Sequence, residues 1–342
     1  MNFNYTIISK NILKGLSPRA RNILEKRFGL DLEDAGLKKA TLESIGREYG
    51  ITRERVRQIE KEELEKVKKE AQSKQGDVFR YLEKKIRDSG SLREEKSLVS
   101  EIEVSSKMSG FSGKNIANHI IFLLSLDPRL KRQKESDLFY TFWMLEQKSL
   151  ERAKKVIADF SKLLKKEKSP LTLDYYLEKR KVSDVPVKAV PHYLKISKVI
   201  LKNSEGEYGF SDWPEINPRG VKDMAYLSLR KEGKPLHFSA IAQNIGKESH
   251  IQTVHNELIK DARFILVGRG VYGLKEWGYE PGTVQEIIFK TLKKKNHPMS
   301  KLEIVNNVLN QRFVKKNTIL LNLNNKKYFQ KDNQGKYRIR LT

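Results

Sequence analysis

The chain has 342 residues, 38% of them hydrophobic, which is enough for several domains with apolar cores. It contains no cysteine, which excludes disulfides, a thiolate zinc site and a cysteine nucleophile and fits a reducing cytoplasm. Its 68 Lys and Arg against 43 Asp and Glu give a net charge of +25, which predicts a polyanionic partner.

A membrane is the weaker candidate for that partner. The basic residues are spread through globular-looking sequence and not along one amphipathic helix. The longest apolar run, residues 120–124, is far too short to cross a bilayer, and no secretory apolar segment is evident near residue 1. We therefore expect no membrane association and a cytoplasmic location.

The first elements in chain order are a short arm over residues 1–11, with weak periodicity, and a helix up to Phe28. Ser17 and Pro18 are predicted to start this helix, because proline needs no N–H in a first helical turn. Ile23, Leu24 and Phe28 would form its apolar face.

Residues 41–69 predict two helices joined by a tight turn. Thr41 is a suitable N-cap for the first helix, and Thr52 is one for the second. Gly50 can adopt the left-handed conformation that ends the first helix. This order is typical of a helix-turn-helix.

The second of these helices has two faces. At 100° per residue, one arc of about 140° holds polar side chains, namely Arg53, Glu54, Arg57, Gln58 and Lys61. Val56, Ile59 and Val67 lie largely opposite, while Leu64 fits neither group and predicts another packing partner. Arginine can bind guanine, glutamine adenine and glutamate cytosine, so the polar face suits the major groove of DNA.

Three segments, residues 16–20, 27–30 and 41–69, together resemble region 4 of bacterial primary sigma factors, and residues 52–60 match its recognition helix almost letter for letter. The resemblance covers about residues 12–70. It implies that Arg53, Glu54, Arg57 and Gln58 read the bases of an upstream promoter hexamer in double-stranded DNA. It also implies that Thr41, Thr52 and Lys61 contact phosphates and that the domain docks on the β flap of RNA polymerase. The alternative is a charged, solvated helix face.

After a polar linker at residues 69–77, the chain shows an internal repeat. Residues 206–213 match residues 270–277 position by position, and residues 335–337 carry the core of the same pattern. Tyr208, Tyr272 and Tyr337 are spaced by 64 and 65 residues, which predicts tandem copies of one small unit. Each copy would have helices followed by a hairpin across a glycine turn, as in residues 264–274.

The predicted fold is therefore mainly α, with a helix-turn-helix domain followed by small winged-helix-like (α+β) domains. The expected boundaries are 12–72, 76–146, 150–217, 218–280 and 281–342. The copy expected at residues 218–280 resembles the HARE-type helix-turn-helix. The matching residues are 225–227, 234–238, 241–242, 254–259 and 263–277. That family occurs in the delta subunit of bacterial RNA polymerase, in restriction-associated proteins and in chromatin proteins.

Basic residues concentrate at the end of the chain. Residues 281–342 hold fourteen Lys and Arg against three carboxylates, a net charge of +11. The candidate phosphate contacts are Arg269 at a hairpin tip, Lys315 and Lys316 before a predicted helix at 319–324, and Lys326 and Lys327 beside aromatic residues. We expect Phe329 and Tyr337 in the core; the alternative for the basic residues is a solvated surface.

No residues predict catalysis, a metal, a cofactor or a small-molecule ligand. His250 and His255 are five apart, which is not the spacing of a helical metal pair, and there is no phosphate-binding GxxxxGK motif. We expect a DNA-binding transcription protein that recruits or modulates RNA polymerase. Only about a dozen residues precede the sigma-like segment, so a regulator fits better than a complete sigma factor. The alternatives are a delta-like polymerase subunit acting through protein contacts and a DNA-modification or restriction accessory protein.

Overall fold

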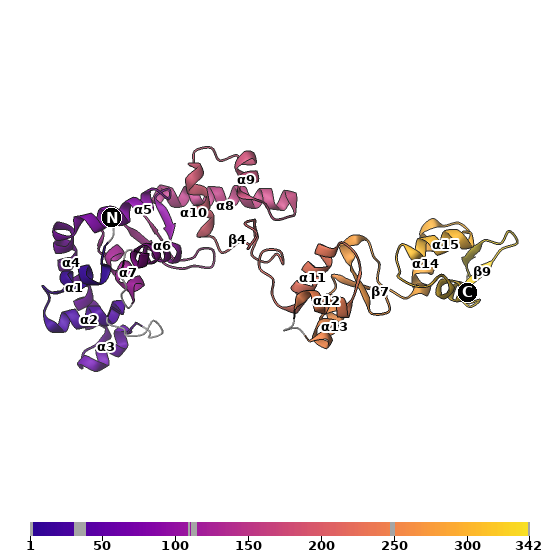
Figure 1. Cartoon of the computed structure of the whole chain (residues 1–342), viewed down its shortest axis with the longest axis horizontal. Helices are drawn as coiled ribbons and strands as arrows, with labels where there is room; N and C mark the ends of the chain where they lie inside the picture. The colour runs from indigo at the N-terminus through magenta and orange to yellow at the C-terminus, as the bar shows by residue number, and fades with distance from the viewer. Residues whose placement is uncertain (1–2, 31–38, 109, 111–114, 247–249, 341–342) are drawn as a thin grey trace. The chain divides into compact units, whose positions relative to one another are not determined.

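The computed structural model describes residues 3–30, 39–108, 110, 115–246 and 250–340. It divides into two compact units, an N-terminal unit of residues 1–211 and a C-terminal unit of residues 212–342 (Figure 1). Helices account for 58% of the described residues, and the strands form small antiparallel sheets, so the mainly helical class predicted from sequence is confirmed. None of the helices in these described ranges is long and apolar enough to cross a membrane.

The N-terminal unit begins with four helices, α1 (Tyr5–Leu13), α2 (Pro18–Phe28), α3 (Leu42–Tyr49) and α4 (Arg53–Lys74). The arm predicted at residues 1–11 is wrong from Tyr5 onward, because this segment is helical. Tyr5, Ser9, Ile12 and Leu13 are buried at helical spacing and face one core. A serine occupies one of the four buried positions, which weakens the apolar periodicity of this short segment.

The linker predicted at residues 69–77 is also wrong. Helix α4 continues to Lys74, and α5 (Gly76–Arg87) begins two residues later. Val67, Ala71 and Val78 are buried through this stretch, so a few small or apolar side chains anchor a segment that is otherwise polar.

One hydrophobic core joins these helices to the segment that follows. Helix α7 (Ile116–Leu126) packs against α1, α2 and α4. The rings of Phe28 and Phe122 meet edge to face at 5.0 Å, and the Asn118 side chain donates a hydrogen bond to the Gly29 carbonyl at 2.9 Å. Leu64, which fitted neither face of its helix, packs against this same cluster. The core therefore crosses the boundary predicted at residues 72–76.

The same order of elements, a helix, a strand or bridge, two helices and a hairpin, occurs four times. We call these the first to fourth repeats. The first comprises α5, β1 (Leu92–Glu94), α6 (Glu95–Met108), α7, β2 (Lys131–Gln133) and β3 (Phe142–Met144), with antiparallel sheet order β1-β3-β2. Trp143 of the central strand pairs with Arg93 on one side and Arg132 on the other.

The second repeat completes the N-terminal unit, and a Leu171–Tyr208 bridge takes the place of its first strand. Its elements are α8 (Gln147–Glu167), α9 (Leu173–Lys179), the 3-10 turn η1 (Val187–Ala189), α10 (Val190–Lys195), β4 (Ile200–Lys202) and β5 (Tyr208–Phe210).

The C-terminal unit holds the other two repeats. The third comprises α11 (Val221–Glu232), β6 (Leu236–His237), α12 (Phe238–Ile245), α13 (Ile251–Lys260), β7 (Phe264–Gly268), β8 (Val271–Leu274) and η2 (Lys275–Trp277). Its sheet order, β6-β8-β7, matches that of the first repeat, and its hairpin lies where the sequence predicted one. The fourth comprises α14 (Val284–Lys295), α15 (Lys301–Leu309), α16 (Lys316–Leu323), β9 (Phe329–Lys331) and β10 (Tyr337–Ile339), with a Met299–Tyr337 bridge.

A buried arginine ties the third and fourth repeats together. Arg312 is 3% exposed and donates hydrogen bonds to the carbonyls of Glu280 and Gly282 at 2.6 and 2.7 Å. Beside it, the Phe313 N–H donates to the Val267 carbonyl at 2.7 Å, which attaches the end of β7 to the chain before α16.

Candidate nucleic-acid interface

The turn between α3 and α4 is fixed by a backbone hydrogen bond and by two threonine caps. The Thr41 hydroxyl accepts the Ser44 N–H at 3.0 Å and caps α3. Gly50 has φ +63°, and the Ile51 N–H donates to the Gly46 carbonyl at 2.9 Å, so α3 ends where the sequence predicted. The Thr52 hydroxyl then accepts the Arg55 N–H at 3.1 Å and starts α4.

Gly46 allows α3 to approach this turn closely. A Cβ at this position would lie 2.7 Å from the Ile51 carbonyl oxygen. A separate small core of Ile23, Ile45 and Val56, each fully buried, holds α2, α3 and α4 together. Sequence reasoning did not single out Gly46, although a glycine inside a helical pattern often marks such a contact.

The exposed face of α4 carries the predicted base-reading residues. Arg53, Glu54, Arg57 and Gln58 are all exposed, as is Lys61 one turn later, while Val56 on the opposite face is fully buried. Thr41 and Thr52 are also exposed, at the starts of α3 and α4. The helix-turn-helix therefore places seven of the twelve predicted contact residues near its turn or along α4.

Two side chains of this face are bonded to each other. The Arg57 guanidinium donates to both carboxylate oxygens of Glu54, at 2.8 and 2.6 Å. This hydrogen bonding lowers the pKa of Glu54 and raises that of Arg57, so both groups are charged at neutral pH. Arg55, which sequence reasoning did not name, donates to Gln58 at 3.1 Å. The pairing holds the polar ends along the helix surface.

Arg27 fixes α4 against the start of α3. Its guanidinium lies 3.0 Å from Glu60 on α4 and donates to the Ala40 carbonyl at 2.8 Å. On the other side of α3, the Tyr49 hydroxyl donates to the Asn22 side chain at 2.7 Å. These contacts set the direction in which α4 presents its exposed face.

The third helices of the first two repeats are committed to packing. Seven of the eleven residues of α7 are buried. In α10, Val190, Tyr193 and Leu194 are buried, and the Tyr193 hydroxyl donates to the Gly90 carbonyl at 2.7 Å. These two helices therefore do not present a free face comparable with that of α4.

The hairpin of the first repeat is also occupied. Its Tyr140 N–H donates to the Ile196 carbonyl of the second repeat, and the Lys198 N–H donates to the Leu138 carbonyl, both at 2.9 Å. Of these three helices of the N-terminal unit, α4 therefore keeps an exposed polar face, whereas α7 and α10 do not.

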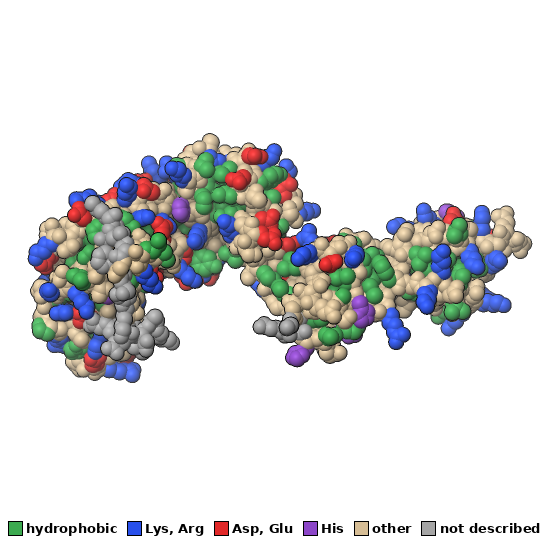
Figure 2. Space-filling view, in the orientation of Figure 1, with side chains coloured by type: hydrophobic (Ala, Val, Ile, Leu, Met, Phe, Trp, Pro, Cys, Tyr) green, Lys and Arg blue, Asp and Glu red, His purple; other side chains and the backbone are tan. Residues whose placement is uncertain are grey.

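The other five predicted contact residues lie in the C-terminal unit. Arg269 occupies the exposed tip between β7 and β8, Lys315 and Lys316 stand at the start of α16, and Lys326 and Lys327 precede β9; all five are exposed. Helix α16 begins at Lys316, three residues before its predicted start. Figure 2 shows Lys and Arg side chains over the visible faces of both units.

The aromatic neighbours of these lysines behave as expected. Phe329 is buried in the core of the fourth repeat, and Tyr337 packs against that core. Among the described residues, no group of three or more His, Cys, Asp or Glu is arranged to hold a metal ion.

Comparison with known proteins accounts for the helix-turn-helix. Residues 12–69 match the model of sigma-70, region 4. Residues 12–69 are a sigma-70 region 4 domain. The chain is 46% identical over 66 residues to the RNA polymerase sigma factor SigA of Listeria monocytogenes, and 43% identical over 61 residues to the RNA polymerase sigma factor RpoD of Neisseria gonorrhoeae.

These matches cover only a small share of this chain and of each relative. The alignments cover 19% and 18% of this chain, and the chain spans 17% of the SigA protein and 9% of the RpoD protein. The SigA of Microcystis aeruginosa gives 49% identity over 59 residues, which is 13% of its length. The remainder of the chain is unassigned, so the winged-helix and HARE-type resemblances and the boundaries predicted after residue 76 stay predictions.

Proposed function

We propose that this protein is a sequence-specific DNA-binding transcription factor that reads a promoter element with α4 and acts on bacterial RNA polymerase in initiation. The observation that carries the proposal is the exposed row of Arg53, Glu54, Arg57 and Gln58 on the helix after the turn, within a region 4 domain. The relatives are RNA polymerase sigma factors, which supports the polymerase as the partner. The resemblance to sigma region 4 adds the β flap of the polymerase as the docking site.

Reading proceeds through the first turns of α4 in the major groove. Arg53 and Arg57 suit the paired acceptors of guanine, Gln58 suits adenine, and Glu54 suits the amino group of cytosine. Because the Glu54–Arg57 pair is exposed, it is weak in water, and Arg57 can exchange its partner for a base edge. Thr41, Thr52 and Lys61 would contact phosphates on either side of the groove.

We take the four repeats to be winged-helix-like domains with different roles, in supporting the region 4 domain and in binding DNA. The buried third helices of the first two repeats support a scaffold role that holds the region 4 domain. The fourth repeat, with its excess of lysine and arginine, supports a sequence-independent grip on DNA through Lys315, Lys316, Lys326 and Lys327, with Arg269 beside it.

A second candidate function, a delta-like polymerase subunit that works through protein contacts, is favoured by one observation. The exposed surface of α13 includes Ile251 and Ile259, at 50% and 63% exposure, and its only basic side chain of Lys or Arg type is Lys260. A helix face of this kind suits a protein partner better than a phosphate backbone.

The test is selection of bound sequences from a random duplex library, with the parent and with Arg57→Ala. The parent should enrich one short motif, and the variant should lose preference at one base pair, with a drop in affinity for the motif on the order of 10- to 100-fold. Lys66→Ala, an exposed change further along α4, is the control and should keep the motif. A parent that enriches no motif, or an Arg57 variant that enriches the same one equally well, would falsify the base-reading role.

A further inference from the structure

Two pockets in the repeats are lined in part by lysine side chains. One, of about 420 Å³, lies between α8 and α9 of the second repeat. The other, of about 340 Å³, lies between α14 and α15 of the fourth repeat. Each therefore sits between the first and second helices of its repeat, and each compact unit contains one. Neither includes a residue assigned above to DNA contact.

The two pockets occupy equivalent places in the chain. Helices α8 and α14 both end in a left-handed residue, Lys168 and Asn296, whose N–H donates to the carbonyl four residues earlier. All five α8 residues that line the first pocket have counterparts 128 residues later on α14 that line the second: Asp159 and Ile287, Lys162 and Lys290, Leu163 and Thr291, Lys166 and Lys294, and Glu167 and Lys295. This interval is twice the 64-residue spacing of Tyr208 and Tyr272.

A lysine pair four residues apart is the charged feature common to both pockets. It consists of Lys162 and Lys166 in one and of Lys290 and Lys294 in the other. When α11 of the third repeat is aligned by its own left-handed end, Gly233, the corresponding residues are Leu227 and Lys231, so the pair is not kept there.

In the second repeat, lysines outnumber carboxylates around the pocket by four to two. The Asp159 carboxylate already accepts two hydrogen bonds within the repeat, from the Tyr176 hydroxyl and from the Lys181 N–H, both at 3.2 Å. Glu167 lies 3.9 Å from the Lys166 ammonium. The pocket thus keeps a surplus of positive charge above a wall that includes Leu163 and Tyr175.

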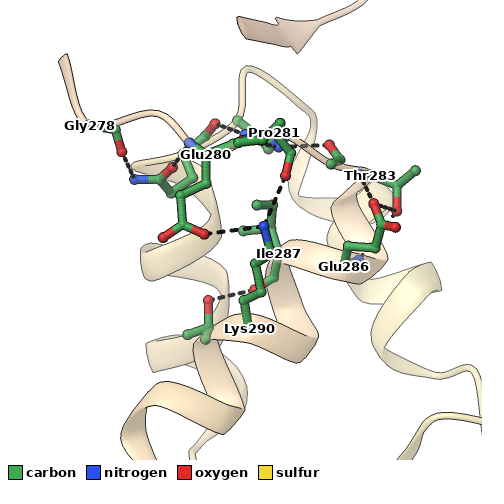
Figure 3. A network of polar contacts seen from close by, with 11 residues as sticks. Gly278, Glu280, Pro281, Thr283, Glu286, Ile287 and Lys290 are labelled. Atoms are coloured by element: carbon green, nitrogen blue, oxygen red, sulfur yellow. Dashed lines mark hydrogen bonds and ion pairs between the residues drawn. The ribbon is translucent and has the colours of Figure 1, made fainter. Parts of the chain in front are cut away.

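In the fourth repeat, three lysines face one carboxylate. Figure 3 shows Lys290 beneath the chain that enters α14, where its ammonium donates to the Pro281 carbonyl at 3.1 Å and lies 3.4 Å from Glu280. Lys294 and Lys295 supply the other two positive charges, and the amides of Asn307, Asn310 and Gln311 complete the polar lining.

Helix electrostatics alone does not account for the lysine pairs. Cations are favoured in the last turn of a helix, which covers Lys166 and Lys294. Lys162 and Lys290 stand a full turn earlier, and like charges four residues apart weaken a helix. Their side chains start about 5–6 Å apart, close enough for one anion to bind both and relieve the repulsion.

We propose that both pockets bind phosphate groups of a nucleic-acid backbone, one pocket in each compact unit. Ammonium and amide donors match the anionic oxygens of a phosphodiester, and a lysine pair acts on it as two point charges. The contact is independent of sequence and adds to the contacts proposed above for α4 and for the basic residues of the C-terminal unit. The inference rests on the proposed DNA binding but not on base reading by α4.

The experiment compares Lys166→Gln/Lys294→Gln with the matched control Lys165→Gln/Lys293→Gln. The control removes the same charge from the adjacent residue of the same last turn, outside both pockets. Binding of each full-length protein to a random-sequence duplex is measured across a salt series. The pocket variant should lower the slope of log affinity against log salt by about 0.9 per lost phosphate contact, roughly 1.8 in all, and the control should leave it near the parent value.

An equal loss of slope in both variants would assign the effect to diffuse charge, and no loss in either would leave the pockets without DNA; each result overturns the proposal. Inorganic tripolyphosphate is the second probe. If the pocket variant loses tripolyphosphate binding but keeps the parent slope on DNA, the nucleic-acid source is wrong. Arg57→Ala separates the two proposals, because loss of the motif with an intact pocket effect would remove only base reading.

Discussion

Gly46 shows how a single missing side chain shapes the candidate interface. Its position has room for a hydrogen but not for a methyl group, because the Ile51 carbonyl oxygen would lie 2.7 Å from a Cβ. Gly46→Ala should therefore push α3 away from the turn and destabilise the protein by about 1–3 kcal/mol, the usual range for overpacking. Thermal unfolding followed by circular dichroism measures this change.

Gly76→Ala is the control for that prediction. Gly76 opens α5, and a Cβ at this position would meet an Arg80 guanidinium nitrogen at 3.7 Å, an ordinary contact. Alanine there should leave the unfolding midpoint unchanged or raise it slightly, since alanine is the better helix former. Equal destabilisation by both substitutions would mean that the close approach at the turn is not what Gly46 provides.

At the scale of elements, the sequence predicted those helix ends that are set by hydrogen bonds between neighbouring residues. Thr41, Gly50 and Thr52 set the ends of α3 and α4 through hydrogen bonds within a few residues, so the helix-turn-helix could be predicted. Helix α1 and the later turns of α4 are buried in a core shared with α7, far along the chain, so their own sequences predicted an arm and a linker instead. The apolar run at residues 120–124 indicates a buried helix, but no local signal indicates which elements α7 and α10 pack against.

Helix α10 gives a prediction about this packing. Tyr193→Phe removes the hydroxyl that donates to the Gly90 carbonyl and keeps the ring, so it should lower the free energy of unfolding by about 1 kcal/mol. Because α10 is buried against β1, the substitution should not alter the sequence motif or the salt dependence of DNA binding. Urea unfolding and duplex binding test the two parts, and a changed motif would show that α10 contacts DNA after all.

At the scale of the whole molecule, the candidate base reader shares its core with a repeat that begins after it in the chain. Phe122 of α7 is fully buried and its ring meets that of Phe28 in α2. Phe122→Ala should remove about 3–5 kcal/mol of stability and should lower the hydrogen-exchange protection of α2 and α4 along with that of α7.

Phe329→Ala makes a comparable cavity in the C-terminal unit, where Phe329 is 3% exposed. Because the two compact units have separate cores, this control should leave α4 protected. Protection of α4 that survives Phe122→Ala would mean that the region 4 domain folds independently of α7, and the scaffold role of the first repeat would then lose its support.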